Sequence, residues 1–324
     1  MLTAAPVSSR TSAQSSGRRR IGVLLSVVLL SVVLLGTTAC ATVKKVAINK
    51  LGDSLAASGT TFASDDDVEL IGQAVPFSLK LIESLLAESP NHTGLLFAAA
   101  SGFTQYANVY VHQDADVMDA QDLEKSAALR ARARRLYLRA RNYGLRGLDV
   151  RHRGFSQGLR HDPKQAVLAA KASDVPLLYW TAASWGLAIA LSKDNPDLIA
   201  DQPIVEALID RASALDPDFD SGAIHGFLIS YELARQGAGG DPVVRATQHF
   251  DREVALTRGQ LASPFVSFAE AVSVPNQDRA GFEALIQRAL AVDAEARPEW
   301  RLQNLVMQRR ARWLLSREAD LFIK

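Results

Sequence analysis

The stretch Ile209-Asp210-Arg211-Ala212-Ser213-Ala214-Leu215-Asp216-Pro217 decides the fold, because its pattern returns along the chain. Phe250–Leu256 match its first seven residues after 41 positions, and Ile286–Val292 follow after another 36. A large apolar residue and a small one three positions later lie on the same face of a helix. The small residue lets a neighbouring helix approach, so the pattern predicts helices that pack in pairs.

Looser copies of this pattern lie upstream, at Tyr137–Tyr143 and Ile82–Glu88. The pattern resembles the second helix of a tetratricopeptide unit, in which stacked helix pairs share a continuous core. The spacing departs from the usual period of about 34 residues, so a regular array is not expected. We predict a tetratricopeptide-like α-solenoid of stacked helix hairpins. Chance similarity among helices rich in alanine and leucine is the alternative.

Helix starts are marked by residues that favour the N-cap position and stand directly before proline. An N-cap side chain accepts a bond from an unpaired N–H, and proline at the first helical position loses no helical hydrogen bond. The pairs are Asp162-Pro163, Asn195-Pro196, Asp216-Pro217, Asp241-Pro242 and Ser263-Pro264. Between them apolar residues recur at three- and four-residue spacing, without the alternation of strands. The predicted fold class is all-α.

Cys40 is the only cysteine of the 324 residues, and it ends an export signal. Arg18–Arg20 precede the apolar run Ile21–Leu35, and small residues lead to the cysteine, as in a secretory signal peptide. The apolar run is shorter than the roughly 20 residues of a membrane-spanning helix. The site resembles the lipobox of bacterial lipoproteins, although Thr37 stands where leucine is usual. We predict cleavage before Cys40 and its lipidation; an uncleaved anchor and a plain secretory signal are the alternatives.

The predicted organisation follows from this cysteine. Residues 1–39 form the removed signal peptide, residues 40–62 the lipidated cysteine and its tether, and residues 63–324 the helical domain. A lipid-anchored exported protein of a bacterium is expected in the periplasm. Ala41 replaces the aspartate of many lipoproteins kept at the inner membrane, which favours the outer membrane.

Composition excludes several function classes. Hydrophobic residues make up 48% of the chain and charged residues 22%, with a formal net charge of +1. These values fit neither a disordered chain nor a protein that binds nucleic acid with its whole surface. Arg130–Arg153 contain nine arginines and one acid, which we interpret as a solvated helix face or a protein interface.

Three short segments contain residue types used in catalysis or metal binding, but each lacks a feature that the function requires. Gly154–Gly158 spell G-x-S-x-G, but a nucleophile elbow needs a preceding strand, and an arginine-rich helix end precedes it. His112–Asp116 and Asp65–Asp67 lack the glycine and the distant glutamate of a calcium loop. We interpret them as an acidic interhelical loop and a helix N-terminus. No catalytic residue, metal site or cofactor is predicted.

The aromatic helix that follows Asp174 is the remaining candidate site. It carries Tyr179, Trp180 and Trp185 beside small residues such as Gly186. Aromatic residues usually bury, so packing between repeats is one interpretation. The other is that the rings line a pocket for an apolar ligand.

Several stretches resemble the T-component family of TRAP transporters (TatT), which are tetratricopeptide-like periplasmic lipoproteins. These stretches are residues 58–67, 102–107, 174–186, 222–225 and 309–315. The resemblance implies a helical scaffold without catalysis, whose partners are a periplasmic solute-binding protein and a TRAP permease. Residues expected to bind a ligand or partner are Tyr179, Trp180, Trp185 and His225.

Two classes of function remain open. The first is a transport accessory that docks a solute-binding protein and holds an apolar ligand. The second is a tetratricopeptide-type lipoprotein that acts only as a protein-interaction scaffold in envelope assembly. Both classes predict membrane attachment through the lipid on Cys40, and neither predicts binding of nucleic acid. Formation of a homo-oligomer is compatible with both.

Overall fold

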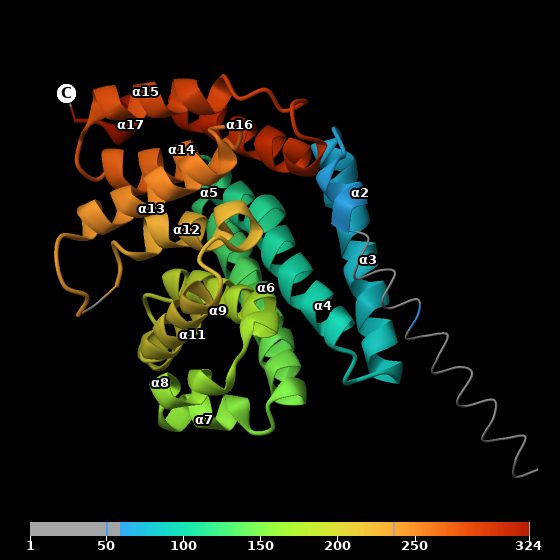
Figure 1. Ribbon diagram of the computed structural model, residues 1–324. Helices are drawn as coiled ribbons and strands as arrows, with labels where there is room; N and C mark the ends of the chain where they lie inside the picture. Colours follow the sequence, from blue (N-terminus) through green and yellow to red (C-terminus); the bar gives the residue numbers. More distant parts are fainter. Residues whose placement is uncertain (1–49, 51–58, 236, 324) are drawn as a thin grey trace, which may run out of the picture. The chain divides into compact units, whose positions relative to one another are not determined.

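The computed structural model of the chain describes Lys50, residues 59–235 and residues 237–323. The chain divides into two units, Met1–Lys50 and Leu51–Lys324, and every element named below belongs to the second. Each regular element in the described ranges is helical, which confirms the all-α prediction (Figure 1). The predicted signal peptide, Cys40 and most of the tether lie outside the described residues.

The helices fall into three consecutive groups along the chain. The first is α2 (Gly59–Ala63), α3 (Val68–Glu88), α4 (Thr93–Ala107), the π-helical turn η1 (Asn108–His112), α5 (Gln113–Met118) and α6 (Leu123–Arg151). The second is α7 (Phe155–His161), α8 (Pro163–Ala166), η2 (Val167–Ala169), η3 (Ala172–Asp174), α9 (Val175–Ala190), α10 (Pro196–Ile199) and α11 (Gln202–Leu215). The third is α12 (Phe219–Tyr231), α13 (Pro242–Thr257), α14 (Ser263–Phe268), the π-helical turn η4 (Ala269–Ser273), α15 (Arg279–Leu290), η5 (Pro298–Trp300), α16 (Arg301–Ser316) and α17 (Glu318–Leu321).

Three of the cap–proline pairs begin helices as predicted. The side chains of Asp162, Asn195 and Asp241 accept backbone N–H bonds at the starts of α8, α10 and α13. In each case proline is the first helical residue, where its missing N–H has no partner to lose. These local signals therefore set the starts of three helices.

The other two pairs behave differently. Ser263 is itself the first residue of α14 and does not cap the helix with its side chain. The prediction of a helix start at Asp216-Pro217 is wrong, because the N–H of Asp216 bonds to the carbonyl of Ala212 and so closes α11. The next helix, α12, begins only at Phe219.

Helix α9 occupies a central place, in contact with α4, α6, α11 and α12. Glycines on α6 allow its close approach to that helix. A Cβ on Gly144 would lie 2.1 Å from the Thr181 hydroxyl oxygen, and one on Gly147 would lie 2.9 Å from the Leu177 side chain. Only glycine fits there, so α6 fixes the position of the aromatic helix.

The repeat predicts correctly which helix faces are buried. Its copies lie in α3, α6, α11, α13 and α15. The first position is buried in every copy, at Ile82, Tyr137, Ile209, Phe250 and Ile286. The fourth position is buried too, at Leu85, Ala140, Ala212, Glu253 and Ala289. The arrangement of these helices as a tetratricopeptide-like solenoid stays a prediction.

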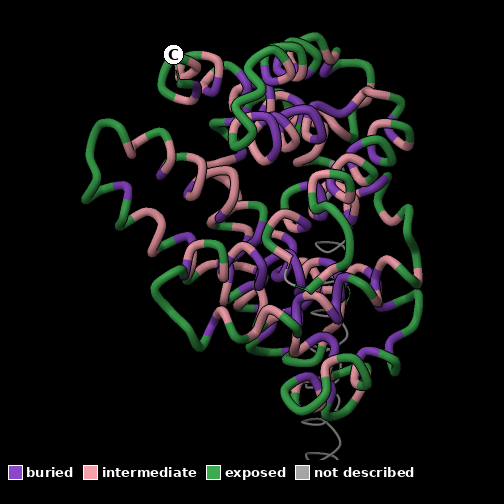
Figure 2. Tube along the Cα trace, turned by 90° about the vertical axis from the view of Figure 1, so that its left-hand side faces the viewer, coloured by how far each residue is buried: buried purple, intermediate pink, exposed green. Residues whose placement is uncertain are grey.

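Buried side chains form two clusters that follow the chain. One joins residues of α4, η1 and α6 to those of α9, α11 and the middle of α12. The other joins the end of α12 to α13, α14, α15 and α16. Figure 2 shows how burial varies along the trace, with most connecting loops exposed. Helix α12 contributes to both clusters and lies where they meet.

Helix α3 is long and apolar enough to span a membrane by length and composition alone. It is the one such helix among the described residues. One side of it packs on α4, and Figure 1 shows the two helices side by side.

Candidate functional site

One ring of the aromatic helix α9 contacts both its neighbour on that helix and a ring at the start of α12. The Tyr179 ring packs edge-on against Trp180, with centroids 4.9 Å apart, and against Phe219 of α12 at 5.6 Å. Tyr179 is buried, whereas Trp180 and Phe219 are half-buried. The three rings therefore form an aromatic cluster with a buried centre and a partly open side.

Trp185 lies on another part of α9 and is buried. Its indole N–H donates to the Asp201 carboxylate at 3.2 Å, and the Arg141 guanidinium lies 4.7 Å from its ring centroid. The side chain is thus enclosed by neighbouring helices and satisfied in its one polar group. Of the residues predicted to bind, Tyr179 and Trp180 share a cluster, and Trp185 has separate partners.

The fourth predicted residue, His225, pairs with a histidine that sequence reasoning missed. Its Nδ1 atom lies 2.8 Å from Nδ1 of His249 on α13, so one ring donates and the other accepts. Burial lowers the pKa of His225, and the nearby Arg252 lowers it further. Burial also lowers the pKa of His249, as does His225 itself. The pair is therefore neutral at pH 7 and joins α12 to α13.

The first turn of α12 has an unusual backbone. Asp220, Ser221 and Gly222 have φ angles of 48°, 56° and 102°, all in the left-handed region. Residues other than glycine rarely occupy this region, at a cost of about 1–3 kcal/mol each, and such strain gathers at functional sites. Asp220 is exposed overall, yet the dense protein around its carboxyl raises its pKa. The strained turn thus adds an acidic group beside the aromatic cluster.

A buried glutamate lies opposite this turn, on α13. Glu253 is only 3% exposed, and its Oε2 atom has no hydrogen-bond partner among the described residues. Burial raises the pKa of Glu253 to about 8, although a hydrogen bond from Ser263 opposes the shift. At neutral pH the carboxyl therefore stays protonated.

Glycines on α12 make room for this carboxyl group. A Cβ on Gly226 would lie 2.9 Å from Glu253 Oε1, and one on Gly222 would lie 3.4 Å from the same side chain. Glu253 occupies the fourth position of the repeat, where Ala212 and Ala289 stand in the neighbouring copies. That mismatch was the one sequence signal that could have identified it. Nearby, the carboxyls of Asp220 and Glu253 both raise the pKa of the Tyr179 hydroxyl, after burial as the main cause.

The groups gathered here suit binding better than bond breaking. Rings of α9 and α12 offer apolar contact, while a neutral carboxylic acid, a phenol and a neutral histidine pair offer hydrogen bonds. Apolar rings with a few placed polar groups match the residue composition of ligand sites. In the described residues no three His, Cys, Asp or Glu side chains are placed to hold a metal ion.

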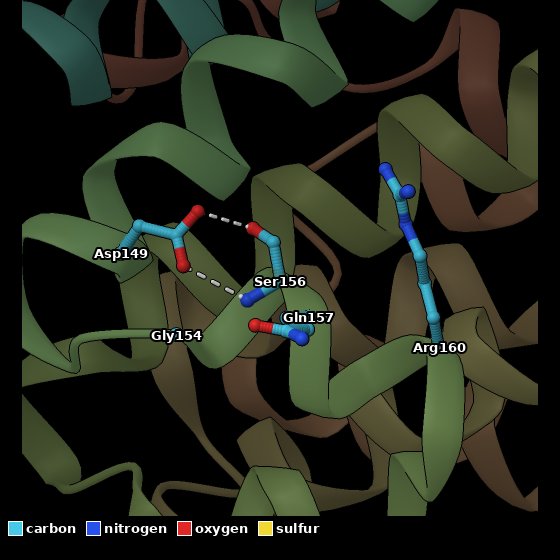
Figure 3. A pocket seen from close by; sticks show the side chains of 5 residues that line it. All are labelled: Asp149, Gly154, Ser156, Gln157 and Arg160. Carbon is cyan, nitrogen blue, oxygen red and sulfur yellow. Dashed lines mark hydrogen bonds between the residues drawn. The ribbon is translucent and has the colours of Figure 1, made fainter.

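A cavity of about 420 Å³ lies elsewhere, at the G-x-S-x-G motif. Figure 3 shows Ser156 bound twice to Asp149, with Arg160 pointing away from the pair. The serine hydroxyl donates at 2.5 Å and its backbone N–H at 2.9 Å, so the carboxylate closes the turn at Gly154. Helix α6 precedes this turn, whereas a nucleophile elbow requires a strand. The lining residues include no histidine to activate the serine.

The segment His112–Asp116 is helical, which corrects its interpretation as an acidic loop. It comprises the end of η1 and the start of α5. Asp116 pairs with Arg310 at 3.0 Å and with Arg130 at 3.3 Å. His112 Nδ1 lies 3.2 Å from the Tyr137 hydroxyl. These side chains tie helices together, because buried charged and polar groups need partners.

Five of the nine arginines of residues 130–153 are exposed, as in the predicted solvated face, and most of the nine also contact other segments of the chain. Arg130 pairs with Asp119 at 2.6 Å, and Arg139 pairs with Glu83 of α3. Arginines of this stretch that contact other segments are Arg130, Arg132, Arg134, Arg139, Arg141, Arg146 and Arg151. These arginine contacts therefore help to hold neighbouring segments against α6.

Fold and site together define a helical protein with a cluster of aromatic and polar side chains on α9, α12 and α13. The sequence profile of the TRAP transporter T-component family matches residues 64–322, and the chain belongs to that family. A Treponema pallidum (strain Nichols) protein, described only as an uncharacterized protein, is 29% identical over 266 residues. The match covers 81% of this chain and 82% of that protein. The chain is thus an accessory component of a TRAP transporter, which indicates an envelope or periplasmic location, and its family is not one of enzymes.

Proposed function

We propose that this protein is a lipid-anchored periplasmic scaffold that docks the solute-binding protein of a TRAP transporter and holds an apolar ligand. The family match across residues 64–322 carries the proposal, because a transporter accessory without enzymatic function must act by binding. A scaffold of envelope assembly that binds no small molecule is the second candidate. The aromatic cluster favours the first, since an assembly scaffold does not need half-buried rings beside polar groups.

The ligand site we propose is centred on Trp180 and Phe219, with Tyr179 behind them. These two rings are half-buried, so part of each ring is available for contact. Tyr179 fixes both by edge-on and tilted packing. An indole ring offers a large apolar face with one N–H donor, which suits an apolar molecule with a single polar group. Trp185 supports α9 in this proposal, and His225 acts by holding α12 on α13.

Docking is tested with the purified full-length protein and the solute-binding protein of the same transporter. We expect a complex at micromolar concentrations, which corresponds to about −8 kcal/mol of binding free energy. Isothermal titration calorimetry measures it, and the Cys40→Ala protein without detergent serves as a control for micelle effects. Absence of a complex at these concentrations, together with no small molecule in the purified protein, would favour the envelope-assembly scaffold.

Membrane attachment is tested at Cys40. The mature protein extracted from membranes should begin at this residue and carry added acyl mass, because the export signal ends there. Three acyl chains, as in bacterial lipoproteins, would hold the protein stably, since each buried methylene contributes about 0.8 kcal/mol. Intact mass spectrometry and membrane fractionation provide the measurements. A Cys40→Ala protein that fractionates equally with membranes at an unchanged mature mass would contradict the proposal.

A further inference from the structure

In the described part of the chain, one side of α3 carries a line of exposed and half-buried apolar side chains, here called the α3 ridge: Leu70, Ala74, Phe77 and Leu81. Their spacing of four, three and four residues places them along one line of a helix. Phe77 is 74% exposed and Leu70 is 54% exposed, while Ala74 and Leu81 are half-buried. The ridge extends for about 16 Å, at about 1.5 Å of helix per residue.

The ridge stands out among the exposed apolar residues of the described chain. The others are Val117, Leu123, Val150, Leu168, Val244 and Ile323. They are scattered singly over other segments, and single exposed apolar residues are ordinary. Only on α3 do two large ones lie two turns apart on the same line. Continuous exposed apolar surface marks an interaction site.

Helix α3 holds the ridge in a fixed position. On its inner side the Tyr110 hydroxyl donates to the Val68 carbonyl at 2.9 Å, and the Tyr110 ring fills the space that a Cβ on Gly72 would need. Near the other end the Tyr143 hydroxyl donates to Glu83 at 2.6 Å. A surface that is already ordered loses little entropy on binding, which favours a firm contact.

The end of the ridge near Leu70 is acidic. Asp66 and Asp67 are exposed, and the Glu69 side chain is 75% exposed. The nearest cation to Glu69 is Arg309, whose Nη1 lies 3.6 Å away. These carboxylates at one end of an apolar line favour a partner with positive charge at the matching place.

We propose that the α3 ridge is the surface on which the solute-binding protein lays an amphipathic helix whose apolar line is flanked by lysine or arginine. Apolar residues at four- and three-residue spacing form the seam between paired helices, and flanking charges set their orientation. The inference rests on the proposed function, because it assigns the docking partner to this surface. It adds the location of the contact and the chemistry of the partner.

The acidic end of the α3 ridge argues against two other binding partners, an anionic membrane surface and a second copy of this chain. Anionic lipid headgroups would be repelled by Asp66, Asp67 and Glu69. In a two-fold contact between copies of this chain, that end would face Lys80, the one lysine of α3. Lys80 already pairs with Glu83 at 2.7 Å, so a second copy supplies little free positive charge.

Photo-crosslinking in the bacterium tests the surface directly. The full-length chain carries p-benzoyl-phenylalanine in place of Phe77, and mass spectrometry sequences the peptide that is captured on irradiation. We expect a helical segment of the solute-binding protein with apolar residues at this spacing and basic neighbours. The same replacement at Val244 of α13, which is 53% exposed, should capture none of it. Capture only of a second copy, of residues 1–58 of the same chain, of phospholipid or of nothing overturns the proposal.

Binding measurements separate this proposal from the proposed function. Phe77→Asp should raise the Kd for the purified solute-binding protein at least about tenfold, or about 1.4 kcal/mol. Glu69→Lys should raise it less and weaken its salt dependence, because it removes an exposed charge. Circular dichroism should be unchanged for both variants. If the wild-type chain binds and Phe77→Asp binds equally well, the ridge proposal fails and the proposed function stands. If the wild-type chain does not bind, docking itself fails.

Discussion

Replacing Trp185 with alanine should lower the free energy of unfolding by about 3–5 kcal/mol, the range for removing a buried tryptophan. The ring is 5% exposed, so its loss leaves a cavity beside α9. The change also removes the N–H donor to Asp201 and the ring under Arg141. Urea denaturation followed by circular dichroism measures the change. Each kcal/mol should lower the Tm by roughly 2–4 °C in a domain of this size class.

Trp180→Ala is the matched control, because it removes the same side chain from the same helix. Trp180 is half-buried, so we expect a smaller loss of stability. Under our proposal we expect mass spectrometry to detect an apolar molecule in the purified wild-type protein, and this variant, rather than Trp185→Ala, should lose it. A Trp185→Ala protein that unfolds like the wild type but loses its bound molecule would instead place Trp185 in the ligand site.

Glu253→Gln should make the protein more stable at pH 8 and flatten the fall of its stability with rising pH. Burial raises the pKa of Glu253 from its ordinary value of 4.5 to about 8 in the folded protein. Between these values the unfolded carboxyl has lost its proton and the folded one has kept it. Folding therefore takes up a proton, and each unit rise in pH costs about 1.4 kcal/mol of stability from this group. Glutamine has a similar shape and no charge, so this contribution disappears.

Denaturation at pH 5, 6, 7 and 8 gives the slope of the unfolding free energy against pH for the wild type and for Glu253→Gln. Among the described residues the hydrogen bond from Ser263 opposes the rise in the pKa of Glu253, and no cation does so. Parallel slopes for wild type and Glu253→Gln would contradict the buried neutral carboxyl.

Glu232→Gln serves as a control in which the same replacement should lower the stability of the protein instead of raising it. Glu232 is as buried as Glu253, but it pairs with Arg245 at 2.6 Å and Arg235 at 2.9 Å. These partners hold the pKa of Glu232 below its ordinary value even though burial alone would raise it. Glutamine there should destabilise the protein at neutral pH, because it removes the carboxylate that pairs with Arg245 and one of the carboxylates that pair with Arg235, which also contacts Asp210.

Much of the helical fold could be predicted from local sequence. A cap residue before proline acts within one turn, which is why Asp162, Asn195 and Asp241 mark true helix starts. The same signal is wrong at Asp216, where the hydrogen bond to Ala212 closes the preceding helix instead. Helical periodicity likewise predicted the buried face of each repeat copy, since residues three apart share a face whatever lies opposite.

The candidate site could be predicted only in part. Tyr179 and Trp180 were identified as aromatic residues on one helix, and His225 entered through the family resemblance. Their partners Phe219 and His249 come from other helices, and sequence spacing carries no information about which helix will lie opposite. The carboxylate partners of the arginines from Arg130 onward could not be predicted for the same reason, because they lie on other segments.

By itself, therefore, the sequence determined the helical class of this protein, three of its helix starts, the buried positions of the repeat and membership of the family, because these depend on signals within a few turns. Only the tertiary structure decided that Glu253 is a neutral acid, since that depends on its burial and on its close contact with Gly226. It also decided that Trp185 is enclosed and that Phe77 is exposed. An aromatic side chain has the same tendency to bury at both places, and only the presence or absence of a neighbouring helix separates a core residue from a contact surface.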